Sequence, residues 1–118
     1  SANKQDREIS AKQAQVRQAH AMHDDVVRET QANIASSYVE WQSLIERRKT
    51  LASALLPAVR QRIDLTLAAY RGGQVSLATV LEARRAEVEA QLQLLDLERE
   101  AARLWAQLQY VYAEGAQQ

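Results

Sequence analysis

Apolar residues recur every three or four positions along most of this chain, which is the spacing of one face of an α-helix. Over the C-terminal stretch the steps alternate between three and four, as they do in a coiled coil. This first stripe consists of Val80, Ala83, Glu87, Ala90, Leu94, Leu97, Ala101, Leu104, Leu108 and Val111. The spacing predicts one long helix over about residues 77–113, with Gly115 placed to end it.

A second apolar stripe follows the same stretch, and the pattern places it beside the first. Its members are Leu81, Arg84, Val88, Leu92, Leu95, Ala102, Trp105 and Tyr112. One stripe serves a pair of helices, whereas two stripes make a face wide enough for neighbours on both sides. We therefore expect this helix to belong to a sheet-like or barrel-like array of helices.

The N-terminal half carries a weaker and more polar stripe at similar spacing. It runs through Val16, His20, His23, Val27, Thr30, Ile34, Tyr38, Trp41, Ile45, Arg48, Leu55, Val59, Ile63, Thr66 and Tyr70. No glycine interrupts residues 5–71, and Pro57 is the only proline in the chain. Proline within a helix removes one hydrogen bond and costs about 3 kcal/mol, so we predict a bend near residue 57, as a kink and not a loop.

The only adjacent glycines stand between these two stretches, in the segment YRGGQVSLATVL of residues 70–81. Glycine adopts positive φ at little cost, as a reversal between two helices requires. Ser76 is a good N-cap for the second helix, although Thr79 stands where a capping-box glutamate would. We predict an all-α fold in one domain, 1–118: a long antiparallel helical hairpin, or coiled coil, with helices over about 5–71 and 77–113 and a tip over 72–76.

The two predicted helices differ in length. At about 1.5 Å per residue, the first would reach roughly 100 Å and the second about 55 to 60 Å. Pairing that starts at the tip therefore ends near residue 33, and residues 5–32 have no partner within the chain. We expect that stretch to pair with another segment, the isolated chain to self-associate as a dimer or other oligomer, or the first helix to break near Pro57 and fold back.

Composition argues against several classes of function and of site. The 118 residues include 15 basic and 15 acidic side chains, and this zero net charge argues against a nucleic-acid partner. There is no cysteine, which excludes disulfides, thiolate metal sites and cysteine nucleophiles. No apolar run approaches the roughly 20 residues of a membrane-spanning helix.

The segment HAMHDD is the one candidate for metal chemistry. It places His20, His23 and Asp24 on one side of a helix, a spacing that can surround a metal ion. Both histidines also fall on the apolar stripe, so ordinary stripe or surface histidines are the favoured interpretation and a metal site is the alternative. Nothing positions a nucleophile beside a base. We expect no catalytic residue, no cofactor and no enzymatic activity.

The tip residues Tyr70, Gly73, Ser76, Val80, Leu81 and Ala83, at their spacing in this sequence, resemble the hairpin tip of the TolC-type outer-membrane efflux proteins. The following EARRAEVEAQLQLLDLEREAARLWAQLQYVY resembles the returning helix of the cation-efflux branch, typified by cobalt-zinc-cadmium exporters. The resemblance covers about residues 6–112. It implies a trimeric outer-membrane β-barrel that continues into the periplasm as an α-helical barrel, and this chain lacks the alternating strands of such a β-barrel. We therefore expect a periplasmic hairpin of that larger protein, which meets the membrane only through the β-barrel.

The resemblance also implies a function, that of a passive tunnel segment in a tripartite, RND-type system that exports heavy-metal cations and confers heavy-metal resistance. Its implied partners are a periplasmic adaptor (membrane fusion) protein and an inner-membrane pump. The adaptor would dock on Tyr70, Arg71, Gly72, Gly73, Gln74, Val75, Ser76 and Leu77. Glu82 matches a position that lines the periplasmic entrance, with a solvated helix charge as the alternative. A free-standing coiled-coil scaffold is the alternative function.

Overall fold

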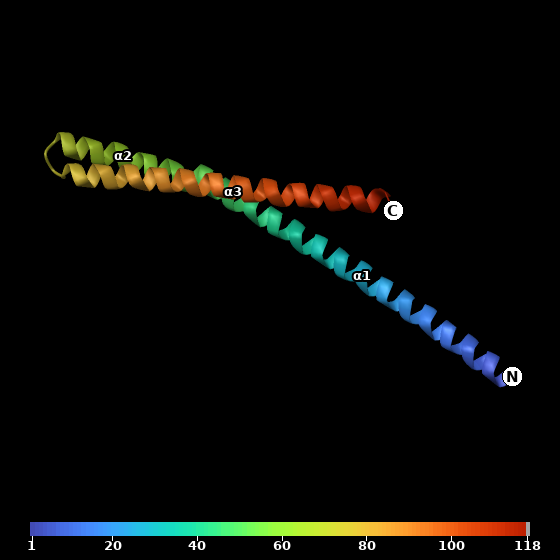
Figure 1. Cartoon of the computed structure of the whole chain (residues 1–118). Helices are drawn as coiled ribbons and strands as arrows, with labels where there is room; N and C mark the ends of the chain where they lie inside the picture. Colours follow the sequence, from blue (N-terminus) through green and yellow to red (C-terminus); the bar gives the residue numbers. More distant parts are fainter. Residues whose placement is uncertain (118) are drawn as a thin grey trace. The chain divides into compact units, whose positions relative to one another are not determined.

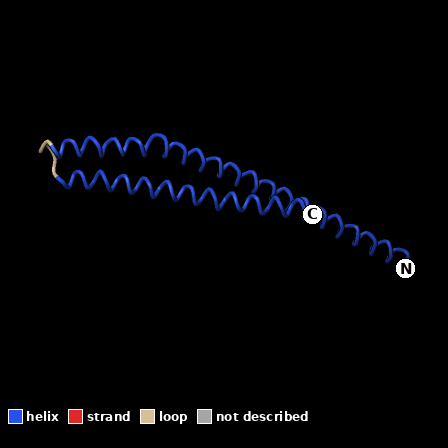
Figure 2. Tube along the Cα trace, turned by 90° about the horizontal axis from the view of Figure 1, so that it is seen from above, coloured by secondary structure: helices blue, strands red, loops and turns tan. Residues whose placement is uncertain are grey.

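The chain is almost entirely helical in the computed structural model, which describes residues 1–117. Its elements are α1 (Ala2–Thr50), a π-helical turn η1 (Leu51–Leu55), α2 (Leu56–Arg71) and α3 (Leu77–Gln117). No strand occurs among residues 1–117, and the predicted all-α hairpin is confirmed. Figure 2 shows the single stretch of loop, which joins two long helices at one end. The structure divides into two units, residues 1–36 and the part that begins at Ser37, which are described in turn.

The first unit is the N-terminal part of α1. Strong helix formers such as alanine, glutamine, lysine and arginine fill it, and neither glycine nor proline interrupts it. Every residue from Ser1 to Ser36 is exposed, including Ile9, Val16 and Met22. The apolar stripe predicted here is therefore open to solvent, and pairing with another segment or chain stays a prediction.

The second unit is the hairpin, in which α2 and α3 lie side by side and antiparallel (Figures 1 and 2). The first stripe of α3 faces the other arm. Val80, Ala83, Ala90, Ala101 and Leu104 are buried, with Ala83 wholly inaccessible. Glu87, Leu94, Leu97 and Leu108 are half-buried. Because three buried members are alanines, the two helix backbones can approach closely along this line.

An aromatic and aliphatic cluster closes the hairpin away from the tip. Leu44 of α1 packs with Ala101 and Leu104 of α3, and Trp41 contacts the same cluster. The ring centroids of Trp41 and Trp105 are 4.8 Å apart. Two ion pairs also join the arms, Arg48 to Glu98 at 3.1 Å and Arg60 to Glu87 at 3.4 Å. These pairs are partly exposed, so they help to fix the register and add little to stability.

The turn η1 shifts the register of the apolar stripe by one residue. The Leu56 N–H donates to the Leu51 carbonyl, five residues back, whereas an α-helix bonds four residues back. The buried leucines on either side are accordingly Leu51 and Leu56. One extra residue is therefore held in this turn, and the apolar stripe moves by one position.

The sequence pattern predicts that Leu55 lies on the buried stripe, and this prediction is wrong. It is 43% exposed, whereas Leu56 is buried, because the wider turn carries the stripe past Leu55 to its neighbour. The helix continues past the position near Pro57 where we predicted a bend. Its irregularity is the π-helical hydrogen bonding of the five residues before Leu56. The Ser53 hydroxyl donates to the Lys49 carbonyl at 2.7 Å in this region, as serine does where a helix ladder is loosened.

Most of the second stripe of α3 lies beside the first. Successive helix residues are about 100° apart, so Leu81, Val88 and Leu95 each stand about 100° around the helix from the first-stripe residue that precedes them, and Leu92 stands about 200° from Ala90. The large apolar members of the second stripe are all exposed, namely Leu81, Val88, Leu92, Leu95, Trp105 and Tyr112. The helix thus presents two apolar lines; the hairpin covers the first, and the second stays largely open to solvent although Trp105 also packs against Trp41.

Gly115 does not end α3, which continues through it to Gln117. A side chain at Gly115 would meet nothing within 4 Å, and the only glycine with positive φ among the described residues is Gly73. Glycine in a helix interior costs about 1 kcal/mol relative to alanine, which a helix of this length tolerates. The described residues include no helix that is long and apolar enough to cross a membrane.

Candidate functional site at the hairpin tip

The end of α2 is a Schellman motif. The Gln74 N–H donates to the Ala69 carbonyl at 2.8 Å, and the Gly73 N–H donates to the Tyr70 carbonyl at 2.9 Å. These two bonds are the six-to-one and five-to-two pairs that define the motif. They satisfy carbonyls that a helix end leaves open and turn the chain sharply away from the helix axis.

The two glycines are not equivalent in this turn. Gly73 has φ of 73°, the left-handed conformation that the motif needs and that other residues adopt at a cost. Gly72 has φ of −82° and ψ of 1°, which any amino acid can adopt. The expectation that the glycine pair supplies positive φ therefore holds only for Gly73.

Ser76 caps α3, as the sequence predicts. The Thr79 N–H donates to the Ser76 carbonyl at 3.1 Å and approaches the Ser76 hydroxyl at 3.4 Å. The Thr79 hydroxyl lies 3.2 Å from the Ser76 hydroxyl, where a capping-box glutamate would reach back to the main chain. The chain between Gly73 and Ser76 is thus held at both ends by hydrogen bonds.

The predicted docking residues form one exposed surface. Tyr70, Arg71, Gly72, Gly73, Gln74, Ser76 and Leu77 are exposed, and Val75 is half-buried. Directly behind this surface, the buried Val80 and the inaccessible Ala83 hold α3 against α2. The tip is therefore a small cap held by hydrogen bonds, in which two glycines leave main chain bare beside the exposed side chains of Tyr70, Arg71, Gln74 and Leu77.

Glu82 lies on α3 shortly after the tip and is exposed. No ion pair among residues 1–117 involves it. It is therefore available to line an opening formed with other chains, and that role stays a prediction.

The structure does not gather the candidate metal ligands into a site. His20, His23 and Asp24 are all exposed on α1. Residues 1–117 contain no group of three or more histidine, cysteine or acidic side chains placed to hold a metal ion. The interpretation of these histidines as stripe or surface residues stays a prediction.

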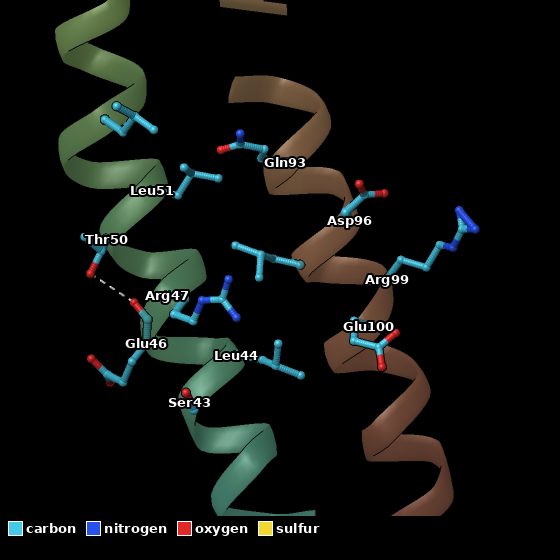
Figure 3. Close-up of a pocket in the computed structure, with 12 residues that line it drawn as sticks. Ser43, Leu44, Glu46, Arg47, Thr50, Leu51, Gln93, Asp96, Arg99 and Glu100 are labelled. Carbon is cyan, nitrogen blue, oxygen red and sulfur yellow. Dashed lines mark hydrogen bonds between the residues drawn. The ribbon is translucent and has the colours of Figure 1, made fainter. Parts of the chain in front are cut away.

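A groove that sequence reasoning missed lies between the arms beside η1 (Figure 3). Its floor is apolar, with Leu44, Leu51 and Leu97, and its rim carries Arg47, Asp96 and further charged side chains. Glu100 also lines the groove, and a hydrogen bond from the Arg103 guanidinium lowers the pKa of its carboxyl. Leu55, which the sequence spacing placed on the buried stripe, is among the residues that line this groove.

The family model that describes the outer membrane efflux proteins matches residues 2–113. No curated protein and no solved structure matches the chain significantly. Because the family match covers nearly the whole chain, this chain belongs to the outer membrane efflux protein family. Members of that family are outer-membrane and periplasmic channel proteins that form trimers and work with adaptor and pump partners.

Proposed function

We propose that this chain is a wall segment of the periplasmic α-helical tunnel of an outer-membrane efflux channel. The observation that carries the proposal is the pair of apolar stripes on α3, of which the hairpin covers one. A helix in a closed wall needs a neighbour on each side, and α2 supplies only one of them. The family match gives the assembly in which a second neighbour would be present.

We propose different contacts for the side and for the tip of the hairpin. The second stripe packs laterally within the trimer, and the tip docks on the periplasmic adaptor of a tripartite, RND-type system. Export is passive in this segment, so the chain has no catalytic role and needs no cofactor. The exposed main chain of the two glycines, held by the hydrogen bonds of the turn, supports docking, since a preorganised contact loses little entropy on binding.

The lateral contact can be tested in the full-length channel with Leu92→Gln and Leu95→Gln together. Each leucine is more than half exposed in the hairpin, so the hairpin itself should keep its thermal midpoint and helicity. Burial of a leucine is worth about 1.5 to 3 kcal/mol, so the trimer should dissociate at much lower denaturant or detergent concentration. Size-exclusion chromatography with light scattering measures this directly.

The matched control is Glu89→Gln with Asp96→Gln, two exposed acidic side chains one turn from Leu92 on the same face of α3, where the substitution changes charge and removes no apolar area. This variant should remain trimeric. A trimer that resists dissociation equally in both double variants would remove the second stripe from the interface and with it the tunnel-wall proposal.

Heavy-metal cations are the cargo that we propose for the system, on the resemblance of the returning helix to the cation-efflux branch. A strain without the full-length protein should become sensitive to zinc, cobalt or cadmium salts and keep its tolerance of organic dyes and detergents. His20→Ala with His23→Ala should restore full resistance when supplied in the complete protein, because the tunnel wall need not bind the ions that it passes. Sensitivity to organic compounds alone would reject the cation assignment and leave the channel proposal standing.

A further inference from the structure

Two arginines of α3 have no ionic partner in the hairpin. The helix carries four arginines, and the hairpin pairs two of them, Arg84 and Arg103, each with a glutamate three residues away. Arg85 and Arg99 take part in no ion pair among residues 1–117, and both are exposed. Their charges are therefore available to a partner outside the hairpin.

These two arginines lie on one line with Leu92. Seven residues separate each of them from the leucine, so the three side chains repeat along one side of the helix at steps of about 10.5 Å. Each stands two residues, or about 200°, past a residue of the first stripe and so faces away from α2. Figure 3 shows the Arg99 side chain extending away from α1. Leu92 is 55% exposed, so the line is an open leucine between two uncommitted cations.

We infer that the helix of the adjoining subunit that covers the second stripe is acidic: it places one carboxylate against Arg85 and another against Arg99, with an apolar side chain on Leu92 between them. This inference rests on the proposed function, which supplies the neighbour and leaves its chemistry open. The two carboxylates stand about 21 Å apart, which is the length of fourteen helical residues.

The burial of Leu92 is the physical reason for this pairing. A neighbour close enough to cover the leucine also removes water from the guanidinium groups on either side, and a desolvated charge without a partner is costly. The guanidinium group presents a planar fork of donors that a carboxylate matches with two hydrogen bonds. Glu89 and Asp96, one turn from these arginines on α3, pair with neither of them in the hairpin. The neighbour is therefore the source of the balancing charge.

Arg85→Gln with Arg99→Gln tests the pairing in the full-length trimeric channel. Helicity by circular dichroism should not change, because neither side chain makes an ion pair within the hairpin. The dissociation constant of the trimer in urea should rise about tenfold or more, since two charge-assisted contacts are lost. The unaltered trimer should also weaken as the sodium chloride concentration rises, and the variant should lose most of this salt dependence.

Arg47→Gln with Arg62→Gln is the matched control. Both arginines are exposed, lie in the other arm and take part in no ion pair among residues 1–117. This variant should keep the dissociation constant and the salt dependence of the unaltered trimer. Arg85→Lys with Arg99→Lys should keep most of the salt dependence, because lysine retains the positive charge.

The lysine variant also identifies the partner. A water-soluble carbodiimide activates a carboxylate, and a lysine amine in contact with that carboxylate then displaces the activated group and forms an amide, which an arginine does not do. Treatment should therefore link subunits of the lysine variant through positions 85 and 99. Mass spectrometry of the linked peptides should place both acids on one helix of the adjoining subunit, about fourteen residues apart.

Three results would overturn the inference. If the glutamine variant keeps the dissociation constant and the salt dependence of the unaltered trimer, no carboxylate faces these arginines. If the lysine variant links only to Glu89 or Asp96 of its own helix, α3 itself balances the charge. Both results leave the tunnel-wall proposal standing when Leu92→Gln with Leu95→Gln weakens the trimer. If neither the arginine pair nor the leucine pair weakens it, the proposed function fails and this inference falls with it.

Discussion

The π-helical turn offers the sharpest test of how this sequence sets its fold. Two causes could produce it: Pro57, which cannot donate a helix hydrogen bond, or an extra residue in the apolar pattern. The buried residues Leu44 and Leu51 are one heptad apart, as are Leu56 and Ile63, but Leu51 and Leu56 are five residues apart. A continuous α-helix that buried Leu51 would bring Leu55 and later Arg62 toward α3 in place of Leu56 and Ile63. The register therefore requires one extra residue in this turn, whatever stands at 57.

The perturbation is deletion of Ala54 in a Pro57→Ala background. The deletion shortens the five-residue step to four, so Leu44, Leu51, Leu56 and Ile63 can all stay buried on an uninterrupted α-helix. The Pro57→Ala change removes the cost of about 3 kcal/mol that proline would impose on such a helix. We expect the deletion to change the free energy of unfolding by less than about 1 kcal/mol from Pro57→Ala alone, because no buried side chain is lost.

Deletion of Arg47 in the same background is the matched control. It falls between Leu44 and Leu51, so the helix can keep one of these leucines in the interface only by rotating the other out. Both are at least nine-tenths buried, and loss of one should cost about 2 to 5 kcal/mol. Denaturant unfolding followed by the fluorescence of Trp41 and Trp105 measures both free energies.

Two results would refute the register argument. One is an equal loss of stability in the Ala54 and Arg47 deletions. The other is a crystal structure of Pro57→Ala alone with a continuous α-helix through residues 51–55, which would make proline the cause of the turn.

Two further predictions concern the tip. Ser76→Ala should lower the free energy of unfolding by about 1 kcal/mol, because the first turn of α3 loses its cap, and Ser76→Asp should restore it. Denaturant midpoints compare the two, and equal loss in both variants would show that the hydroxyl does not cap. Ala83→Leu should destabilise the hairpin by about 1 to 3 kcal/mol, since Ala83 has no exposed surface and a larger side chain must push the arms apart. Ala78→Leu on the exposed side of the same helix is its control, and equal midpoints for the two would contradict the packing described here.

The pattern of α3 could be predicted from sequence because nothing interrupts it. The alternating steps of three and four correctly predict which residues from Val80 to Leu108 are buried or half-buried, because in a continuous α-helix the spacing between residues determines the side on which they lie. The other arm could not be predicted so well. Leu55 and Leu56 are adjacent and equally apolar, so the choice between them depends on hydrogen bonding that spacing does not reveal.

The tip shows the same limit on a smaller scale. The glycine pair predicts a turn, and Ser76 predicts where the next helix begins, because both follow from local backbone chemistry. The glycine that takes positive φ is the one that follows the end of α2, and with two adjacent glycines the helix could end one residue earlier or later. The hydrogen bonds donated by the Gly73 and Gln74 N–H groups fix the end of α2, so that Gly73 and not Gly72 takes positive φ.

The irregular turn lies in the α1–α2 arm and leaves α3 regular. A one-residue shift rotates all later residues by about 100°, and along α3 it would displace two apolar lines together. One would leave α2, and the other would leave the neighbour that we propose for the second stripe. In the α1–α2 arm, η1 realigns the buried line through Leu51 and Leu56 against a regular α3. The mismatch between the two arms is thus absorbed within one turn, and α3 keeps its periodicity.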